Sequence, residues 1–280
     1  MKLTIKLAAA AAAVLVLAGA FAGCGGTGKS ASASAAQSAA SGKSYTVATR
    51  GTARPFTYVD DKGNLTGFDI EVLKEVERRK PDLHFNFKTM DLASAFIAMQ
   101  SKQVDLIANQ MSCRPEREAK YIFTNTVNNY TETYIMVKED RDDIKTLDDL
   151  KGKKVASQES SEGAKLLHAY DQEHNLGIQF IPINGGSAES VNLVVTGRAD
   201  ASLGYIYNIE SAKKDQGYPV KAVGDPVQEV PTYYLFRKDP QMQKVADEID
   251  QVLKEMKADG TLKKLSVQYL GADYTEPRKK

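Results

Sequence analysis

The segment Gln103-Val104-Asp105-Leu106-Ile107-Ala108-Asn109 decides how this chain folds. Its apolar run is short and ends in a polar residue, which is typical of a buried β-strand. The stretch before it predicts an amphipathic helix, because apolar residues recur there at helical spacing: Leu92, Ala95, Phe96 and Met99. A helix, a polar turn, an aspartate and an apolar strand in this order indicate an α/β unit with parallel strands.

A second unit of the same kind lies further along the chain. The segment Gly197-Arg198-Ala199-Asp200-Ala201-Ser202-Leu203-Gly204 again places an aspartate between a polar turn and an apolar strand. The helix face before it is built from Val191, Val194 and Val195. Asp200 follows Asp105 at an offset of 95 residues. Any α/β protein contains such units, so one pair is modest support, but it favours two similar α/β lobes.

Other elements extend this pattern in both directions. Alternation and β-branched residues predict strands at 45–49 and 84–87, and residues 60–64 are typical of a hairpin turn. A helix is expected to begin near Asp69 and to end before Pro81. Two extended stretches, 133–138 and 232–237, are expected to be crossing strands that join the lobes. The last helix should cover the first lobe with Val245, Ile249, Val252 and Met256.

The first residues have the layout of a secretory signal. Lys2 and Lys6 precede an apolar run over residues 7–22, which is shorter than the roughly 20 residues that cross a bilayer. Cys24 at the expected cut resembles a bacterial lipoprotein signal, in which the cysteine is lipidated and becomes the mature N-terminus. Phe21 departs from the aliphatic residue usual at its position. The alternative is an ordinary secreted protein that is cut nearby and buries Cys24.

The residues after the expected cut contain no large apolar side chain, so residues 25–43 should form a disordered tether. Residues 23–30 fit the phosphate-loop pattern by letter, but that loop needs a buried strand before it and a helix after it. Here a signal precedes it, and we reject the match. Loss of Lys2 and Lys6 with the signal changes the formal net charge from +1 to −1. That balance gives no basic excess for a nucleic acid.

The ends of the two repeated strands predict a ligand cleft. In open α/β sheets, ligands lie beyond the carboxyl ends of the strands. That rule places residues 109–112 and residues 204–205 on opposing walls of one cleft. Arg117 follows the first of these ends, and its guanidinium can fork onto a carboxylate with two hydrogen bonds. On spacing alone, a solvated helix arginine is the alternative.

The second lobe offers a possible anion contact at residues 155–163, where a strand leads into a helix start with hydroxyls and free backbone amides. A plain helix cap is a compatible interpretation. Cys113 is expected to be a small buried thiol. His168 and His174 lack the spacing of a helical zinc pair, and Asp69 and Glu71 do not face each other as catalytic carboxylates would.

Several motifs together resemble a known family, the extracytoplasmic solute-binding proteins of ABC importers for polar amino acids. The resemblance covers roughly residues 45–274, and the chain is most similar to the cystine-binding branch of the family. It implies a periplasmic-binding-protein-like fold (type II), in which two lobes joined by two hinge strands close on a ligand. The matching stretches are Pro55-Phe56, Gly67-Phe68-Asp69-Ile70-Glu71-Val72, Pro115-Glu116-Arg117, Leu150-Lys151-Gly152-Lys153-Lys154-Val155, Gly197-Arg198-Ala199-Asp200 and Ala258-Asp259-Gly260-Thr261-Leu262-Lys263-Lys264-Leu265.

The resemblance implies a set of ligand-binding residues. Arg117 matches the family arginine that grips the ligand α-carboxylate, and Ser161 matches a hydroxyl of the second lobe that helps to hold it. First-lobe polar contacts are implied at Asn109, Gln110 and Ser112. Phe56 belongs to the same expected site, and Arg54 beside it could meet a second carboxylate.

Three positions depart from the family pattern. Ala53 stands where many members have an aromatic residue, and Arg114 replaces a common threonine. Tyr205 stands where the family acid binds the ligand ammonium. Glu159 or Glu162 could take over the ammonium, and the sequence does not decide between them.

These observations predict a lipid-anchored receptor on the extracytoplasmic face of the cell membrane, and not an enzyme. It should bind cystine or another polar amino acid and deliver it to the permease subunits of an ABC importer, as a monomer without cofactor or metal. The alternatives are a dehydratase on the same fold and a sensory or adhesive lipoprotein. The predicted divisions are a signal (1–23), a lipidated cysteine and tether (24–43), lobe 1 (44–135 plus 234–274), lobe 2 (136–233) and a tail (275–280).

Overall fold

The computed structural model describes residues 42–159 and 161–278, within the unit Ala40–Lys280. The predicted signal, Cys24 and the tether up to residue 41 lie outside the described residues. Strand β1 (Lys43–Thr49) already begins at Lys43, so the predicted tether is too long by that residue. None of the helices in the described ranges is long and apolar enough to cross a membrane.

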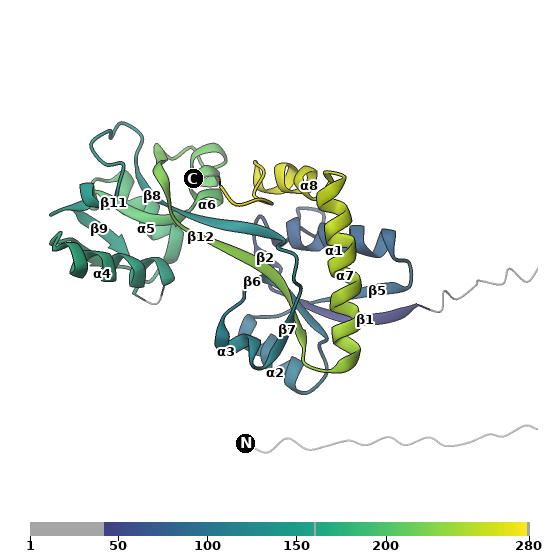
Figure 1. Cartoon of the computed structure of the whole chain (residues 1–280). Coiled ribbons are helices and arrows are strands. Elements are labelled where there is room, and N and C mark those ends of the chain that lie inside the picture. Colours follow the sequence, from purple (N-terminus) through teal and green to yellow (C-terminus); the bar gives the residue numbers. More distant parts are fainter. Residues whose placement is uncertain (1–41, 160, 279–280) are drawn as a thin grey trace, which may run out of the picture. The chain divides into compact units, whose positions relative to one another are not determined.

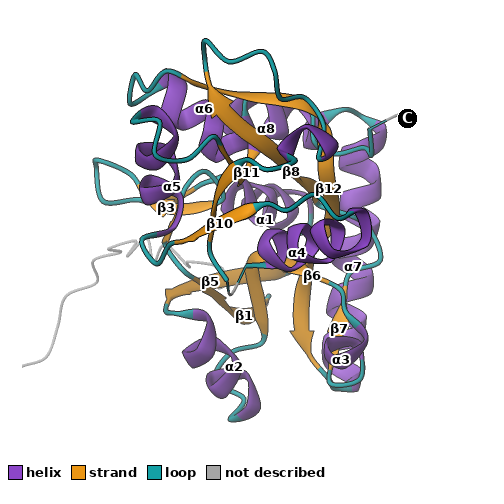
Figure 2. Cartoon of the chain, turned by 90° about the vertical axis from the view of Figure 1, so that its left-hand side faces the viewer, coloured by secondary structure: helices purple, strands orange, loops and turns teal. Residues whose placement is uncertain are grey.

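The main sheet joins two parallel halves through a central antiparallel pair (Figure 1, Figure 2). Its strand order is β10-β9-β11-β8-β12-β6-β1-β5, and β7 pairs with β12 beside this path. β1 is parallel to β5 and β6, and β9 is parallel to β10 and β11. β8 is antiparallel to both β11 and β12. The remaining bounds are β5 (Leu83–Thr89), β6 (Leu106–Ser112), β7 (Tyr121–Phe123), β8 (Asn129–Lys138), β9 (Lys154–Ser157), β10 (Gln179–Pro182), β11 (Ala201–Tyr205) and β12 (Val220–Arg237).

Each half of the sheet packs its own helices. In Figure 1, α1, α7 and α8 lie near β1 and β5, whereas α4, α5 and α6 lie near β9 and β11. Separate groups of buried side chains fill the two halves. The prediction of two α/β lobes joined by crossing strands is confirmed, and the exact lobe boundaries stay a prediction. The helices are α1 (Phe68–Arg79), α2 (Leu92–Gln100), α3 (Pro115–Glu118), α4 (Glu162–His174), α5 (Gly186–Val195), α6 (Ile206–Lys214), α7 (Pro240–Ala258) and α8 (Thr261–Leu270), with a 3-10 turn at Asp148–Leu150.

The local predictions hold for most elements. β1, β5, α2 and β6 occupy the segments assigned to them, and α1 ends at Arg79, just before Pro81. The expected turn closes a hairpin between β3 (Thr57–Val59) and β4 (Leu65–Thr66), which forms a small sheet with β2 (Thr52–Ala53). The apolar face of α7 packs in the core of the first lobe, with Val245, Ile249, Val252 and Met256 all buried.

The first of the two repeated aspartates ties its lobe together. The backbone N–H of Thr46 in β1 donates to Asp105 Oδ2 at 2.9 Å, and the Arg237 guanidinium donates to Oδ1 at 2.7 Å. The backbone N–H of Asp105 in turn donates to the Thr46 carbonyl at 2.9 Å. Asp105 thus fixes β6 against β1 and against the end of β12.

The second aspartate repeats this arrangement in the other lobe. The backbone N–H of Lys154 in β9 donates to Asp200 Oδ2 at 2.7 Å, and Arg141 donates to Oδ1 at 2.6 Å. The Asp200 N–H donates to the Lys154 carbonyl at 2.7 Å. The repeat found in the sequence therefore corresponds to one structural device used twice.

The crossing strands are correctly predicted, but the crossing itself lies elsewhere along them. Residues 133–136 of β8 pair with β11 in the second lobe, whereas residues 232–237 of β12 pair with β6 and β7 in the first. The chain passes between the lobes at residues 129–132 and 229–232, which pair with each other. The crossing was predicted from apolar runs, which indicate strands buried inside a lobe. The residues that pass between the lobes are more polar, so this signal did not locate them.

A cross-strand pair of carboxylates marks the joint. Glu132 and Glu229 face each other in the β8–β12 register, and Glu132 is only 3% exposed. Like charges directly opposite destabilise a sheet. Arg278 relieves this, because its Nε donates to Glu132 at 2.9 Å and its backbone N–H donates to Glu229 at 3.1 Å. The described part of the predicted tail therefore packs on the crossing strands.

The start of α1 lies tightly against the segment that leads into the cleft. The N–H groups of Phe68 and Asp69 donate to the carbonyls of Pro55 and Phe56, both at 3.1 Å. Gly67 has a φ of 115°, and a Cβ there would come within 2.4 Å of the Phe56 carbonyl oxygen. Only glycine fits this position without displacing the backbone, which explains the first letter of the Gly67–Val72 motif.

Candidate functional site

A cavity of about 250 Å³ opens where the two lobes meet the crossing strands. Six of the predicted site residues line it, and they come from both lobes: Phe56, Asn109, Gln110, Ser112, Glu162 and Tyr205. The carboxyl-end rule thus correctly placed the ends of β6 and β11 on one cleft. Sequence reasoning missed other lining residues, among them Arg50, Thr131, Tyr207, Gln228 and Thr232.

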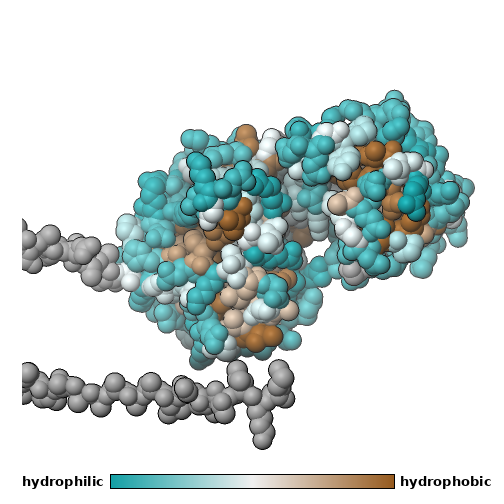
Figure 3. All heavy atoms as spheres, turned by 180° about the vertical axis from the view of Figure 1, so that it is seen from behind, coloured by the Kyte–Doolittle hydropathy of each residue, from teal (hydrophilic) through white to brown (hydrophobic). Residues whose placement is uncertain are grey.

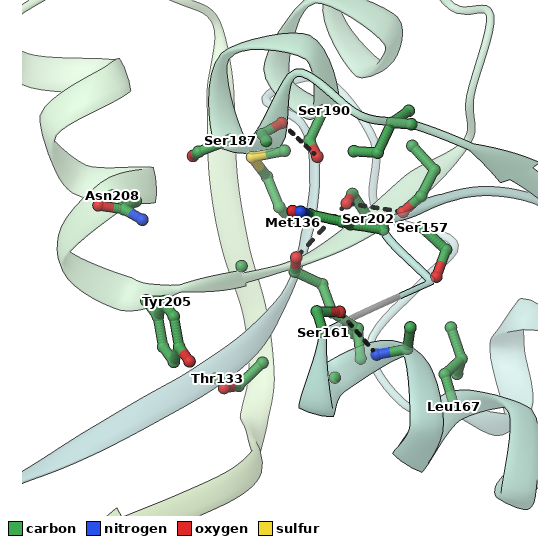
Figure 4. Close-up of a pocket in the computed structure, with 18 of the residues that line it drawn as sticks. Thr133, Met136, Ser157, Ser161, Leu167, Ser187, Ser190, Ser202, Tyr205 and Asn208 are labelled. Atoms are coloured by element: carbon green, nitrogen blue, oxygen red, sulfur yellow. Dashed lines mark hydrogen bonds between the residues drawn. The ribbon is translucent and has the colours of Figure 1, made fainter. Parts of the chain in front are cut away.

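A second cavity, also of about 250 Å³, continues into the second lobe (Figure 4). It shares Tyr205 with the first, and the described residues that line it include no acidic or basic side chain. Ser161 lies here and caps α4 by accepting a hydrogen bond from the Ala164 N–H at 3.0 Å. Hydroxyls surround the space, from Ser157, Ser161, Ser187, Ser190 and Ser202. Hydroxyls beside helix N-termini suit an anionic or neutral acceptor group.

A third and wider cavity, of about 860 Å³, adjoins the first on the other side. Arg54 lines this cavity and not the first, and its guanidinium lies 3.8 Å from the centre of the Tyr58 ring. The two cavities share Arg50, Ala53, Phe56, Tyr205 and Tyr207.

Gln110 is the strained residue of the cleft wall. Its φ of 54° is left-handed, which is uncommon for a residue other than glycine. Its backbone N–H and its side-chain Nε2 both donate to the carboxylate of Asp69, at 3.1 and 2.5 Å. Asp69 is fully buried in α1, so it has a structural role there.

The same glutamine reaches the joint between the lobes. The hydroxyl oxygen of Thr232 in β12 lies 3.3 Å from Gln110 Oε1 and 2.9 Å from Asn129 Oδ1 in β8. Asp69, Gln110, Thr232 and Asn129 thus form a polar chain from α1 through the cleft wall to both crossing strands.

Two arginines follow β6 and differ in their surroundings. Arg117 Nη1 donates to the backbone oxygen and to the hydroxyl of Ser112, at 3.1 and 3.2 Å. Arg117 is therefore held beside a lining residue without lining the cavity itself. Burial and the nearby charge of Arg114 lower the pKa of Arg117. Arg114 does line the cavity, and it lies 3.4 Å from Glu162 of the opposite lobe.

An aromatic group forms one side of the cleft. Tyr205 is 43% exposed and stacks on Tyr207 with ring centres 5.4 Å apart and an interplanar angle of 9°. Phe56 meets Tyr207 edge to face at 4.7 Å. Tyr205 carries no carboxylate, so the acid that lines this cavity among the described residues is Glu162. Lys165, at 3.1 Å, and Arg114 lower the pKa of Glu162. Glu159 lies 3.5 Å from His168 and does not line the cavity.

Cys113 has the environment of an inert thiol. Burial and the hydrogen bond to Glu118 at 3.1 Å raise its pKa to about 12. The side chain is half-buried and not fully buried as expected. Within the described ranges, no group of three or more His, Cys, Asp or Glu side chains is placed to hold a metal ion.

Exposed apolar groups are scattered over the surface, and one of them, Tyr205, lies at the cleft. In Figure 3, hydrophilic residues cover most of the visible face and hydrophobic residues form separate patches. The exposed large apolar side chains among the described residues are Val59, Ile97, Tyr205, Tyr218 and Val267. Scattered groups of this kind are normal on a protein surface, so the cleft is the candidate site.

Comparison with known proteins identifies the family. Residues 45–272 match the family model of bacterial extracellular solute-binding proteins, family 3, and the chain belongs to this family. It is similar to the L-cystine-binding protein TcyJ of Bacillus subtilis (strain 168), with 37% identity over 219 residues that cover 78% of this chain and 81% of the relative. The resemblance predicted from the motifs is confirmed.

Solved structures agree with this. The probable amino-acid ABC transporter extracellular-binding protein ytmK from Bacillus subtilis has a TM-score of 0.78 at 33% identity, covering 83% of this chain and 100% of that one. The L-cystine solute receptor of Neisseria gonorrhoeae, in the unliganded open conformation, has a TM-score of 0.70 at 29% identity, covering 84% and 95%. The predicted periplasmic-binding-protein-like fold is confirmed.

We predict that Asp69→Asn changes how stability depends on pH. Burial raises the pKa of Asp69 to about 7, although its hydrogen bonds with Gln110 act against the rise. The folded state therefore keeps a proton that the unfolded state loses above about pH 4, so this stabilisation disappears as the pH rises through about 7. Asparagine cannot accept both Gln110 donors, and the variant should lose about 1–3 kcal/mol at about pH 5.

Urea unfolding at about pH 5 and about pH 8 measures this effect. The deficit of the variant should shrink by about 2.7 kcal/mol at the higher pH, because about two pKa units separate pH 5 from the pKa of Asp69 and only the wild type then buries a charge. Asp60→Asn, in the exposed hairpin turn, is the control and should show no such pH-dependent difference. A deficit of Asp69→Asn that is equal at both pH values would contradict the assignment.

Proposed function

We propose that this member of the bacterial extracellular solute-binding proteins, family 3, is a receptor that binds an amino acid between its lobes and delivers it to an ABC importer. L-cystine is the proposed ligand, because TcyJ and the gonococcal receptor are both named for it. The observation that carries the proposal is a cavity lined from both lobes, with guanidinium groups at one wall. The permease subunits of the importer are the proposed partners, and the receptor acts as a monomer.

The ligand carboxylate is assigned to Arg117 from the first lobe and Ser161 from the second. The contact with Ser112, which lines the cavity, supports this assignment for Arg117. Ser161 begins a helix whose N-terminal amides favour negative charge. A carboxylate that bridges the two would draw the lobes together, and hinge closure of this kind is a common response to a ligand. The other proposed contacts are Asn109, Gln110, Ser112, Phe56, Tyr205 and Arg54.

The ligand ammonium is assigned to Glu162. This carboxylate lines the cavity, whereas Glu159 does not. In the present structure Glu162 pairs with Arg114 and Lys165. An incoming ammonium could exchange with these half-exposed partners, since surface ion pairs contribute little free energy.

The dehydratase alternative is less well supported. It needs a proton donor in the cleft, and among the described residues the carboxylate that lines the cavity is Glu162, whose pKa its cationic neighbours lower. A carboxyl group of this kind is ionised near neutral pH and is a poor general acid. Turnover of prephenate by the purified protein, with no stoichiometric binding of amino acids, would instead favour the enzyme.

Lipid anchoring at Cys24 is part of the proposal, and it places the receptor on the extracytoplasmic face of the cell membrane. Wild type should fractionate with membranes and carry lipid mass on Cys24, whereas Cys24→Ser should not. Cys113→Ser, which removes the other cysteine, should stay with the membrane. Soluble, unlipidated wild type in its native host would show that the signal has been misread.

We predict that Arg117→Ala weakens L-cystine binding at least about a hundredfold. Removal of one partner from a buried charge pair costs on the order of 3–5 kcal/mol, and about 1.4 kcal/mol corresponds to tenfold. Arg117→Lys should also bind more weakly, because an ammonium cannot reproduce the fork. Calorimetric titration measures the dissociation constants.

The exposed Arg198 in the second lobe provides a matched control, and Arg198→Ala should bind like wild type. Thermal unfolding of each apo protein checks that the folds are intact. If a folded Arg117→Ala binds within about threefold of wild type, the carboxylate is held elsewhere. Arg114 and Arg54 would then be the next candidates.

A further inference from the structure

Arg50 occupies a junction in the cleft and has no assigned role. It directly follows β1, so it lies at a carboxyl strand end, and it lines both the cavity between the lobes and the wider one beside it. Burial raises the pKa of Tyr207 well above its ordinary value, and the charge of Arg50 opposes that rise. Arg50 and Tyr207 also line the same two cavities.

The charge of Arg50 has no partner among the described residues. The other arginines near the cleft are engaged: Arg114 with Glu162, Arg117 with Ser112 and Arg54 with the Tyr58 ring. No ion pair or hydrogen bond between described residues involves the Arg50 guanidinium.

Acidic side chains of the wider cavity are also engaged away from Arg50. Glu210 pairs with Lys214 at 2.8 Å, and the Asp215 carboxylate accepts a hydrogen bond from Ser211 at 2.7 Å. Within the described part of the chain, Arg50 thus presents an uncompensated cation to the space where the two cavities join.

The space beside Arg50 suits an elongated ligand. The two cavities, of about 250 and 860 Å³, adjoin, because they share the lining residues Arg50, Ala53, Phe56, Tyr205 and Tyr207. The rings of Phe56, Tyr205 and Tyr207 line both cavities together with Arg50, and they contact one another. Apolar and sulfur-containing groups pack favourably on such rings. Arg50 and these aromatic rings thus lie where the two cavities adjoin, and Arg114 supplies a second guanidinium to the smaller cavity.

We infer that Arg50 binds the second carboxylate of a ligand whose two carboxylates are joined by an apolar or sulfur-containing spacer, and that it selects such ligands over amino acids with one carboxylate. This inference rests on the proposed function and names the substrate class of the same site. It gives to Arg50 the role that the sequence suggested for Arg54.

The test is calorimetric titration of wild type, Arg50→Gln and Arg50→Lys with two matched probes. The probes are L-cystine and its monoamide, which lacks one carboxylate. Wild type should bind L-cystine at least about tenfold tighter than the monoamide. Arg50→Gln should lose about tenfold for L-cystine and less than about threefold for the monoamide, and Arg50→Lys should lie between. Arg198→Gln, with the same charge change on an exposed residue of the second lobe, should match wild type.

Other outcomes separate this inference from the proposed function. If wild type binds the two probes equally, the proposed receptor function stands, but the inference about Arg50 is overturned. An equal loss for both probes in Arg50→Gln, or no loss, also overturns it, and so does a loss of discrimination in Arg54→Gln alone. If wild type binds neither probe but does bind L-methionine or L-glutamine, the inference fails while the amino-acid receptor stands. Binding of none of these compounds overturns both.

Discussion

The two hydrogen bonds from Gln110 to the buried carboxylate of Asp69 are the constraint on which the cleft depends. They hold Gln110 in a left-handed conformation that a residue other than glycine rarely adopts. Asp69 can serve in this way because Gly67 lets the start of α1 approach the Phe56 carbonyl. The Gly67–Val72 motif therefore shapes the first wall of the site, although Asp69 does not line the cavity.

This constraint also links the site to the hinge. Gln110 meets Thr232, and Thr232 meets Asn129 on the other crossing strand. A ligand that engages the wall at Gln110 would act on the joint through these contacts. Within each lobe the strands are secured separately, by Asp105 with Arg237 and by Asp200 with Arg141. Because these clamps lie inside single lobes, movement at the joint can leave each lobe intact.

The sequence predicted much of this molecule for physical reasons that operate locally. Apolar residues that recur at helical or alternating spacing indicate which face of a single helix or strand is buried. The repeated units around Asp105 and Asp200 predicted the two lobes. The carboxyl-end rule brought Gln110 and Tyr205 to one cavity. Applied to β1, the same rule would have found Arg50, which follows directly after that strand.

The remaining features depend on pairs far apart in the chain. The sequence around Tyr207 does not predict that its ring stacks on Tyr205 at the cleft. The sequence around Arg278 likewise does not predict its contact with Glu132. The sequence suggests a ligand contact for Arg54, but it gives no sign that the guanidinium lies on the Tyr58 ring. Side-chain direction after a strand end depends on neighbours that periodicity does not report.

The central claim is that a ligand held between the lobes closes them. Small-angle X-ray scattering of the folded receptor, with and without saturating L-cystine, tests it most directly when calorimetry confirms binding in the same sample. The account predicts a smaller radius of gyration for the bound wild type and no change for Arg117→Ala at the same L-cystine concentration. A wild type that binds L-cystine with an unchanged radius of gyration would contradict it.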